Sequence, residues 1–391
     1  GYASLFLDFD PEDGIPAGRD WEHELYLNLR RCDAVILLLS KASAHFRWCF
    51  AKLALARSIQ KPVFRLIIEA GATLVLLEDR QLINCPKIDD PTALNRLYNG
   101  LLRAGLKARD AFSLAPDRPP YPGLQPFDSA DAAVFFGRDS EIDRLLGILQ
   151  PTLSQGGRRS ITVVGGSGSG KSSLIRAGLI PRLSKPPGQW YITNPLLPGA
   201  RPLASLARTL STALRDAGID VNWRDLEEEI RKAPDALVDR GHDLVLGLAE
   251  RPSALLMLVD QLEEVVTRAS SPDAGIFLRL LRAMVKHEDT PWWVIATLRA
   301  DFVTARAGDM FLSDLPDQVM LLSPLSQERF FEVIEKPAVR AGLEFETGVV
   351  GRMVQDTLVG DALPLLAYTL RRLYDRAREE DRLIITAADY E

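Results

Sequence analysis

The sequence predicts an α/β protein made of two blocks, each built on a parallel β-sheet. In both blocks short apolar runs alternate with stretches of helical periodicity, which is the pattern of repeated strand–helix–strand units. A segment dense in Pro and Gly, residues 113–127, separates the blocks, and its prolines favour a stiff, extended linker. In the second block one apolar run leads directly into a glycine-rich turn and a helix, as phosphate-binding loops do.

The first block, residues 1–112, carries the signals of a small parallel sheet covered by helices. Its expected strands are the apolar runs at residues 4–9, 34–40 and 62–68, which are typical of strands buried on both faces. Its expected helices are residues 19–31 and 43–59. In the second of these helices Phe50, Leu53 and Ala54 are expected to share a buried face.

The second block begins at about residue 128 and repeats the α/β pattern before it becomes purely helical. Its expected strands are residues 160–165, 254–259, 293–298 and 319–322. Helices are expected at residues 326–341, 348–359 and 364–378, the last with Leu366, Leu370 and Leu373 along one face. We therefore expect a P-loop domain over residues 128–325 and a helical lid over residues 326–391.

Composition limits the classes to which the chain can belong. Of its 391 residues 47% are hydrophobic and 26% charged, the balance of a soluble globular protein, and no apolar run is long enough to span a membrane. The net charge of -6 disfavours a nucleic-acid-binding surface, which needs a surplus of Lys and Arg. The 3 scattered cysteines and 4 histidines disfavour disulfide and zinc sites. We expect a cytoplasmic protein without a membrane or nucleic-acid partner.

The segment from Gly165 to Ser172 satisfies G-x-x-x-x-G-K-S, the phosphate-binding P-loop. Its glycines let backbone N–H groups converge on a phosphate, and the following helix adds its positive N-terminus. Lys171 can reach the β- and γ-phosphates of ATP or ADP, and the Ser172 hydroxyl can ligate Mg²⁺. The residues expected to hold the nucleotide here are Gly165, Gly166, Ser167, Gly168, Ser169, Gly170, Lys171, Ser172 and Ser173.

Acidic residues follow the next long apolar run. Asp260 ends that run and is expected to hold the magnesium water shell together with Ser172. Glu263 and Glu264 come next, and either could orient the attacking water or simply form an exposed, acidic helix start. Arg299 ends the following strand, where it could sense the γ-phosphate or pair with Asp301.

Several segments of residues 121–391 together resemble the novel STAND NTPase 1 group of signal-transduction ATPases. They are YPGLQPF at 121, FFGR at 135, GSGSGKSSLIRAGLIPRL at 166, VDQLEE at 259, LRADF at 298 and GDALPLL at 360. The resemblance implies that Phe136, Gly137 and Arg138 lie near the adenine and that Pro364 of the lid touches the nucleotide. It also implies an ASCE-type P-loop fold and a switch that opens on an unknown trigger, exchanges nucleotide, self-associates and resets by slow hydrolysis. In this family a further C-terminal domain senses the trigger.

The first block resembles a TIR domain, which has a flavodoxin-like fold. The stretches FLDFDPEDGIPAG at 6 and RDWEHEL at 19 carry the resemblance, with Trp48 and Cys49 as the family's W-C pair. Many bacterial TIR domains cleave NAD⁺ with a glutamate three residues after that cysteine. Here that position is Lys52, whose charge would oppose a positively charged transition state, and Phe46 stands where a small Ser is usual.

The resemblance also implies that the block is truncated. The chain begins with Gly and opens at what resembles the family's second strand, so we expect a piece of a longer protein. Loss of a central strand leaves the backbone groups of its neighbours unpaired, so residues 1–70 are expected to be less stable than a complete domain.

Four functions remain open on the sequence. The first is a bacterial defence ATPase whose assembly, through TIR and NTPase domains, activates NAD⁺ hydrolysis or signalling. The second is an ATP-dependent scaffold in which the TIR block is an inactive protein-interaction module, as Lys52 would favour. The third, a nucleic-acid-dependent motor, conflicts with the acidic charge, and the fourth, a metabolic kinase, lacks a signature for a second substrate.

Overall fold

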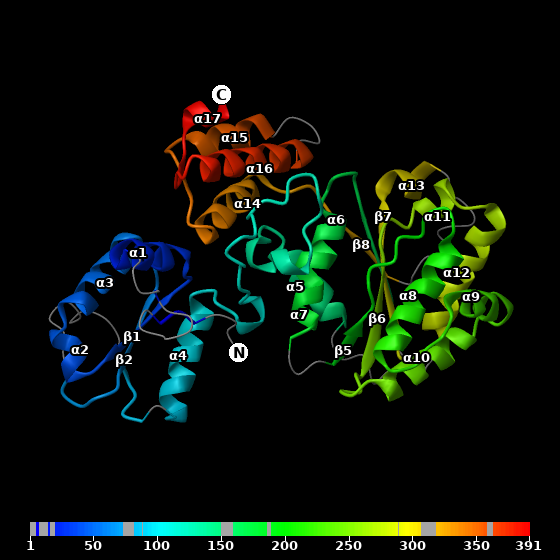
Figure 1. The fold of residues 1–391 in the computed structure, drawn as a ribbon, viewed down its shortest axis with the longest axis horizontal. Helices are drawn as coiled ribbons and strands as arrows, with labels where there is room; N and C mark the ends of the chain where they lie inside the picture. The colour runs from blue at the N-terminus through cyan, green and yellow to red at the C-terminus, as the bar shows by residue number, and fades with distance from the viewer. Residues whose placement is uncertain are drawn as a thin grey trace. The chain divides into compact units, whose positions relative to one another are not determined.

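The computed structural model describes residues 5–7, 15, 20–72, 82–87, 89–149, 159–185, 189–287, 289–305, 318–357 and 363–391. The chain divides into two compact units, drawn in Figure 1. Unit 1 comprises Gly1–Tyr121, Val333–Gly351 and Arg371–Glu391, and unit 2 comprises Pro122–Glu332 and Arg352–Leu370. The C-terminal helices therefore contribute to both units.

Unit 1 contains a parallel sheet of three short strands in the order β1-β2-β3. Its strands are β1 (Val35–Leu39), β2 (Val63–Ile67) and β3 (Ile83–Asn84). The first two confirm the predicted strands, and Val35 lies opposite Val63. Strand β3 was not predicted because a strand of only 2 residues has no apolar run to reveal it. Of the predicted strand at residues 4–9 the structure describes only residues 5–7, which have no regular secondary structure.

Helices of unit 1 pack around this sheet. They are α1 (Trp21–Arg31), α2 (Lys41–His45), α3 (Arg47–Ser58), α4 (Pro91–Arg103) and the 3-10 turn η2 (Ala108–Asp110). The predicted helix at residues 43–59 is in fact α2 and α3, because the chain is extended at Phe46. The predicted buried face of α3 was wrong in part: Leu53 is buried, but Phe50 is 50% exposed and Ala54 is exposed. Ala56, three residues after Leu53, completes the buried stripe and packs against α1.

The C-terminal region confirms the three predicted helices as α14 (Gln327–Arg340), α15 (Val349–Thr357) and α16 (Leu363–Glu379). Leu366, Leu370 and Leu373 are buried, as predicted from their spacing. Two short parallel strands, β9 (Glu344–Phe345) and β10 (Ile384–Ile385), follow α14 and α16, and α17 (Ala387–Tyr390) ends the chain.

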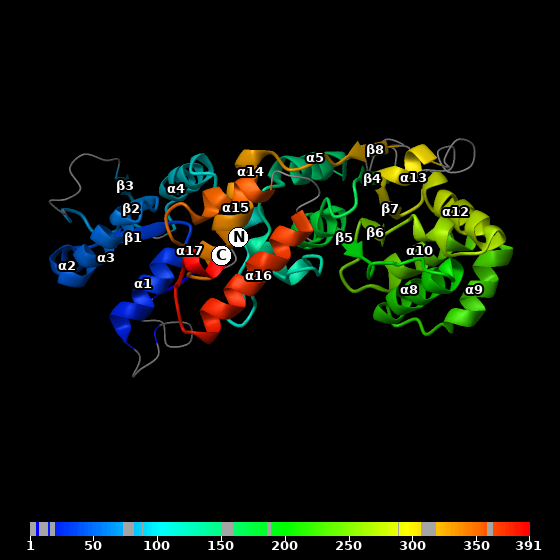
Figure 2. The ribbon, with the colours of Figure 1, turned by 90° about the horizontal axis from the view of Figure 1, so that it is seen from above.

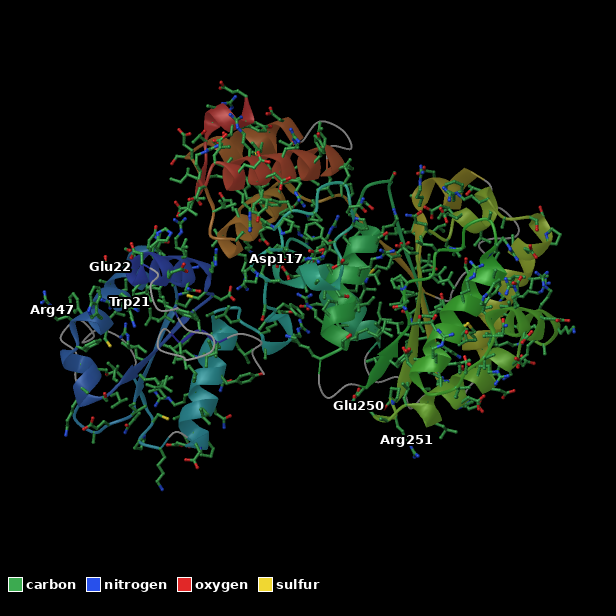
Figure 3. The ribbon with its side chains drawn as sticks, viewed as in Figure 1. Trp21, Glu22, Arg47, Asp117, Glu250 and Arg251 are labelled. Carbon is green, nitrogen blue, oxygen red and sulfur yellow. The ribbon has the colours of Figure 1, made fainter. Side chains whose placement is uncertain are left out.

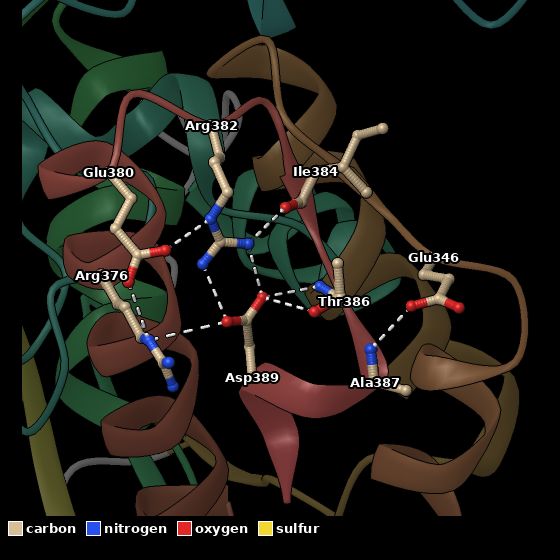
Figure 4. Close-up of polar contacts among 8 residues, drawn as sticks. All are labelled: Glu346, Arg376, Glu380, Arg382, Ile384, Thr386, Ala387 and Asp389. Carbon is tan, nitrogen blue, oxygen red and sulfur yellow. Dashed lines mark hydrogen bonds and ion pairs between the residues drawn. The ribbon is translucent and has the colours of Figure 1, made fainter.

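A polar network fixes the last turn of unit 1 (Figure 4). Arg382 donates to both carboxylate oxygens of Asp389, at 2.7 and 2.8 Å, and this lowers the pKa of Asp389. Asp389 also accepts from the backbone and the hydroxyl of Thr386, closing a capping box at the start of α17. Glu346 accepts from the Ala387 N–H at 2.9 Å, which ties α17 to the chain after β9.

Unit 2 is built on a five-stranded, entirely parallel sheet in the order β5-β6-β7-β4-β8. Its strands are β4 (Ser160–Gly165), β5 (Trp190–Ile192), β6 (Ala254–Val259), β7 (Trp292–Arg299) and β8 (Gln318–Leu321). Four of them confirm predicted strands, and β5 was not predicted. Strand β7 lies between β4 and β6, the arrangement of ASCE-type P-loop proteins, so the predicted α/β fold class is confirmed for this unit.

Helices cover both faces of this sheet (Figures 1 and 2). One core joins α8 (Pro202–Asp216), α9 (Trp223–Lys232), α10 (Ala236–Gly247) and α12 (Ser271–Lys286) to side chains such as Leu255 and Met257. The other core joins α5 (Asp139–Leu149) and the helix after β4 to Leu256 and Leu258. Successive residues of β6 thus enter opposite cores, which is why the run reads as continuously apolar.

Among the described residues, no helix has both the length and the apolar character needed to cross a membrane.

Candidate nucleotide-binding site

The predicted phosphate loop connects β4 to a helix at the carboxyl edge of the sheet. Gly168 and Gly170 have φ of +69° and +87°, a backbone conformation that residues with a Cβ rarely adopt. Gly170 directly precedes α6 (Lys171–Ser173), so the helical N–H groups begin where the loop ends. The helix continues as a π-helical turn, η5 (Leu174–Leu179), and then as α7 (Ile180–Leu183). This is the strand–loop–helix setting that the motif requires.

Lys171 folds back over the loop that precedes it. Its Nζ donates to the carbonyl oxygens of Gly165 and Gly166 at 3.0 and 2.7 Å, and the residue is buried. Burial lowers the pKa of Lys171, while the nearby carboxylate of Glu263 raises it. The ammonium group is therefore held at the loop and oriented by backbone carbonyls, with an acidic neighbour across the site.

Asp260 and Ser172, predicted as the magnesium-binding pair, lie together. Asp260 is 1% exposed, and its Oδ1 accepts from the hydroxyls of Ser172 and Thr297, both at 2.7 Å. Its Oδ2 accepts from Arg176 at 2.7 Å. Strands β4 and β6 are not neighbours, and Thr297 on the intervening β7 bridges the gap. Hydroxyl and carboxylate oxygens at one buried point are a donor set that suits Mg²⁺.

Arg176 and Thr297 were not among the predicted site residues. Both carried a signal in the sequence. Arg176 stands four residues after Ser172 at the start of a helix, so the two lie on the same side of it. Thr297 is a hydroxyl residue inside the otherwise apolar run of β7, where burial obliges it to find a hydrogen-bond partner.

The two candidate glutamates have different surroundings. Glu263 is buried, accepts from the Arg299 backbone N–H at 3.3 Å, and its charge raises the pKa of Lys171. Glu264 instead accepts from the Gly199 N–H at 3.1 Å and forms an ion pair with Arg268 at 3.0 Å. The charge of Glu263 thus acts on Lys171 of the phosphate loop, whereas the partners of Glu264 are Gly199 and Arg268.

Arg299 ends β7 beside the site. Its guanidinium pairs with Asp301 on α13 (Ala300–Ala305) and lies 5.7 Å from the ring centre of Phe302. Its charge also lowers the pKa of Lys171. The charge of Arg299 therefore acts on Lys171 of the loop, while its side chain contacts Asp301 and Phe302 in the helix that follows β7.

Arg138 ties the phosphate loop to its surroundings. The buried guanidinium donates to the carbonyl oxygens of Ser169 and Ser323, at 3.1 and 2.9 Å. It also pairs with Glu141 at 2.9 Å, as does Arg329 of α14 at 2.6 Å. Burial raises the pKa of Glu141, but hydrogen bonds from Ser140, Arg138 and Arg329 outweigh it and lower the pKa to about 2.

Phe136 and Gly137, which are also expected near the adenine, directly precede this arginine in the sequence. Gly137, with φ of +80°, turns the chain between Phe136 and Arg138. The turn leads into α5, whose first residue is Asp139.

The lid proline lies against the loop. A Cβ placed on Gly168 would lie 2.7 Å from Cγ of Pro364, the second residue of α16. The predicted neighbours Gly360, Asp361 and Ala362 lie outside the described residues. Within unit 2, then, the start of α16 and the phosphate loop are in direct contact.

In unit 1 the residues of the second predicted site also lie together. The Lys52 ammonium is 5.3 Å from the ring centre of Trp21, and the rings of Trp21 and Trp48 meet edge to face at 4.7 Å. Trp21 begins α1, while Arg47, at the start of α3, points outward (Figure 3). Phe46 is 48% exposed. The position of the expected glutamate is thus occupied by a cation resting on an aromatic ring.

Comparison with known families gives two matches. The family described as Novel STAND NTPase 1 matches residues 120–391, and the TIR domain family matches residues 2–98. No curated protein matches the chain.

Solved structures show a looser likeness. The Aeropyrum pernix ORC1 protein in complex with DNA is 17% identical over 68% of this chain and 66% of its own, with a TM-score of 0.47. The Aeropyrum pernix ORC2 protein, solved as ADPNP–ADP complexes, is 17% identical over 65% of this chain and 66% of its own, also at 0.47. Drosophila ORC bound to DNA is 16% identical over 66% of this chain and 60% of its own, at 0.45. The chain thus spans slightly less than two thirds of each.

Proposed function

Because the chain belongs to the novel STAND NTPase 1 family and carries a TIR domain at its N-terminus, we propose that it is an ATP-driven signalling switch. In this proposal the P-loop binds ATP or ADP with Mg²⁺, the helical lid reports which nucleotide is bound, and self-association carries the signal to the TIR domain. A trigger that the sequence does not identify starts the cycle, and bacterial defence is the setting we infer for it.

The observation that supports nucleotide binding most strongly is the meeting of Lys171, Ser172 and Asp260 at one edge of the sheet. Lys171 brings a positive charge to the loop, and Ser172 and Asp260 provide the oxygen ligands. Magnesium, when bound, neutralises charge on the β- and γ-phosphates. Ser172 and Asp260 would hold the ion and Lys171 would orient the phosphates, and in this class of reaction positioning and charge stabilisation account for most of the catalysis.

For hydrolysis we assign Glu263 the role of positioning the attacking water. It is buried, close enough to Lys171 to affect its pKa, and fixed by the Arg299 N–H. We assign Arg299 a sensing role, since a bound γ-phosphate would compete with Asp301 for its guanidinium. Turnover is expected to be slow, as suits a switch.

The contact between Pro364 and Gly168 supports the coupling of lid and nucleotide. A phosphate that changes the loop conformation must also change the space available to the first turn of α16. A packed contact of this kind has few alternative arrangements, so a small shift at the loop moves the whole helix.

For the TIR domain we propose two alternatives. One is NAD⁺ hydrolysis on assembly. The other, a catalytically inactive interaction module, is supported by the Lys52 ammonium resting over Trp21. Cells producing the protein with Lys52 or with Lys52→Glu should be compared for NAD⁺ loss. Depletion by the Lys52→Glu protein alone would show a disabled enzyme, whereas depletion by both would show that another residue carries the chemistry.

We propose no nucleic-acid partner, because the net charge of -6 provides no surplus of cations for a phosphate backbone. A gel shift with duplex DNA at low and moderate salt tests this. A shift that weakens as salt rises would contradict it.

The switch itself is tested by measuring molar mass with light scattering. The protein should gain mass with ATP relative to ADP, and Lys171→Ala should keep the same mass in both. Equal masses for the wild-type protein in the two nucleotides would count against assembly on ATP.

A further inference from the structure

Arg176 lies in the π-helical turn η5, directly after the phosphate loop. The carbonyl oxygen of Arg176 accepts from the Ser129 hydroxyl at 3.1 Å, and that of Gly178 accepts from Arg182 at 2.6 Å. Single π-turns often occur at functional sites because they re-aim a side chain relative to a regular α-helix. Here the side chain that emerges from the wide turn is the one that reaches Asp260.

The Arg176 guanidinium forms an ion pair with Oδ2 of Asp260 at 2.7 Å. Its Nε is buried and has no hydrogen-bond partner among the residues that the structure describes. An arginine that leaves a buried donor unpaired gives up part of its bonding capacity, so within the described part of the chain the Asp260 carboxylate is the acceptor that fixes its place. Asp260 itself is 1% exposed, and a buried carboxylate needs a nearby cation or hydrogen-bond donors to offset its loss of water.

The two oxygens of Asp260 have different partners. Oδ1 accepts from Ser172 and Thr297. These hydrogen bonds are compatible with a metal at Ser172, because a hydroxyl can donate its proton while its lone pair ligates. Oδ2 is then the oxygen left to hold the hydration shell of magnesium, and Arg176 is bonded to it. Two cations close to one buried carboxylate also repel each other.

From this geometry we propose that Arg176 is a resident counter-cation of Asp260 that competes with Mg²⁺ for the Oδ2 oxygen. This inference rests on the proposed nucleotide-binding function. Without magnesium, Arg176 keeps the buried carboxylate compensated and the site formed. Binding of Mg²⁺ with the nucleotide requires the Arg176–Asp260 pair to open or loosen. The pair therefore reduces the gain in nucleotide affinity that Mg²⁺ provides.

The test is the magnesium enhancement of ADP binding, defined as the Kd in EDTA divided by the Kd in excess Mg²⁺, measured on the full chain by calorimetry. Arg176→Gln should raise the enhancement about tenfold over the wild-type protein, since the lost bond is charge-assisted. Arg215→Gln is the matched control, because Arg215 is an exposed arginine of α8 that pairs with Asp220 at 3.9 Å. Its enhancement should equal that of the wild-type protein.

Thermal unfolding without nucleotide gives a second readout. Arg176→Gln should unfold at a lower temperature than Arg215→Gln in EDTA, and added Mg²⁺ should recover part of the difference. Arg176→Lys keeps the charge and should keep an enhancement near that of the wild-type protein, which leaves the proposal testable if the Gln variant does not fold.

An enhancement in Arg176→Gln that equals or falls below the wild-type value would overturn the proposal. So would an Arg176→Lys protein whose enhancement rises as far as that of Arg176→Gln. If the wild-type protein binds ADP and Lys171→Ala does not, such a result leaves the nucleotide site intact and removes only the role of Arg176. If the wild-type protein binds no ADP in either buffer, the proposed function fails as well.

Discussion

At the scale of single residues, the site depends on buried charges that compensate one another. Asp260 accepts hydrogen bonds from Ser172, Thr297 and Arg176. Lys171 is held by two carbonyl oxygens, with Glu263 nearby. A buried charge that loses its partner destabilises the folded protein by roughly 3–5 kcal/mol. Removal of one of these charged groups is therefore expected to destabilise the site around the others.

The assignment of Glu263 predicts a contrast with its neighbour. Glu263→Gln should lower steady-state ATP hydrolysis by about a hundredfold or more while ATP still binds, because the water loses its base. Glu264→Gln is the matched control, since Glu264 bonds to Gly199 and Arg268. Phosphate release and ATP calorimetry on both variants measure the effect. A larger loss of hydrolysis in Glu264→Gln would reverse the assignment.

Glu141 predicts an acid-sensitive contribution to stability. Its pKa in the folded protein is about 2, below its ordinary value of 4.5. A depressed pKa stabilises the folded state above pH 4.5, and this contribution is lost as the pH falls from 4.5 towards 2.

Urea unfolding of the wild-type protein over this range should therefore show stability falling with pH, and Glu141→Gln should show a shallower fall. The control is Glu250→Gln, at an exposed position that is distant in the sequence from Arg138 and Arg329, the ion-pair partners of Glu141. Parallel curves for the wild-type and Glu141→Gln proteins would contradict the role of Glu141.

At the scale of elements, the burial and the length of a strand decide whether it could be predicted from the sequence. The apolar runs of β4, β6 and β7 predicted those strands because a parallel sheet covered by helices is buried on both faces. Strands β3 and β5, of 2 and 3 residues, carry too few residues for any pattern. The break between α2 and α3 at Phe46 was also not predicted. A single extended residue does not change the hydrophobic periodicity, so the sequence pattern did not reveal it.

The contact of α16 with the loop predicts a coupled pair of substitutions. Gly168→Ala should lower the free energy of unfolding by about 1–2 kcal/mol, because the residue has positive φ. The new Cβ would also meet Pro364. Pro364→Ala removes the contacting ring atoms, so the double variant should recover part of the loss.

Urea midpoints of the two single variants and the double variant give the coupling energy. Gly147→Ala, in α5, is the control: outside the local helix backbone, an added Cβ there meets no atom of the described residues within 4 Å, and the change should be neutral or slightly stabilising. Strictly additive effects of Gly168→Ala and Pro364→Ala would show that the lid and the loop are not coupled.

At the scale of the whole molecule, sequence motifs predicted the two families, whereas the fold was needed to identify the remaining residues of the site. The G-x-x-x-x-G-K-S motif located Lys171 and Ser172, and the end of an apolar run located Asp260. Spacing places Arg176 on the side of the helix that carries Ser172. The meeting of Arg176 and Thr297 at Asp260 could not be predicted from spacing, because it depends on the strand order β6-β7-β4. The division of the C-terminal helices between two units likewise depends on packing between distant segments.

The first turn of α16 suggests how a nucleotide signal could leave the loop. Helix α16 starts beside Gly168, and Pro364 in its first turn contacts the loop. A helix transmits a displacement along its length because its backbone hydrogen bonds keep it stiff. Nucleotide binding at the loop is the first condition for such a signal.

The decisive experiment is calorimetry of ATP binding in the presence of Mg²⁺, with the wild-type protein, Lys171→Ala and the exposed control Arg215→Gln compared side by side. We expect the wild-type and Arg215→Gln proteins to bind one ATP with equal affinity, whereas Lys171→Ala should show no measurable heat of binding. Unchanged affinity in a folded Lys171→Ala protein would contradict the assignment of the phosphate site and the switch built on it.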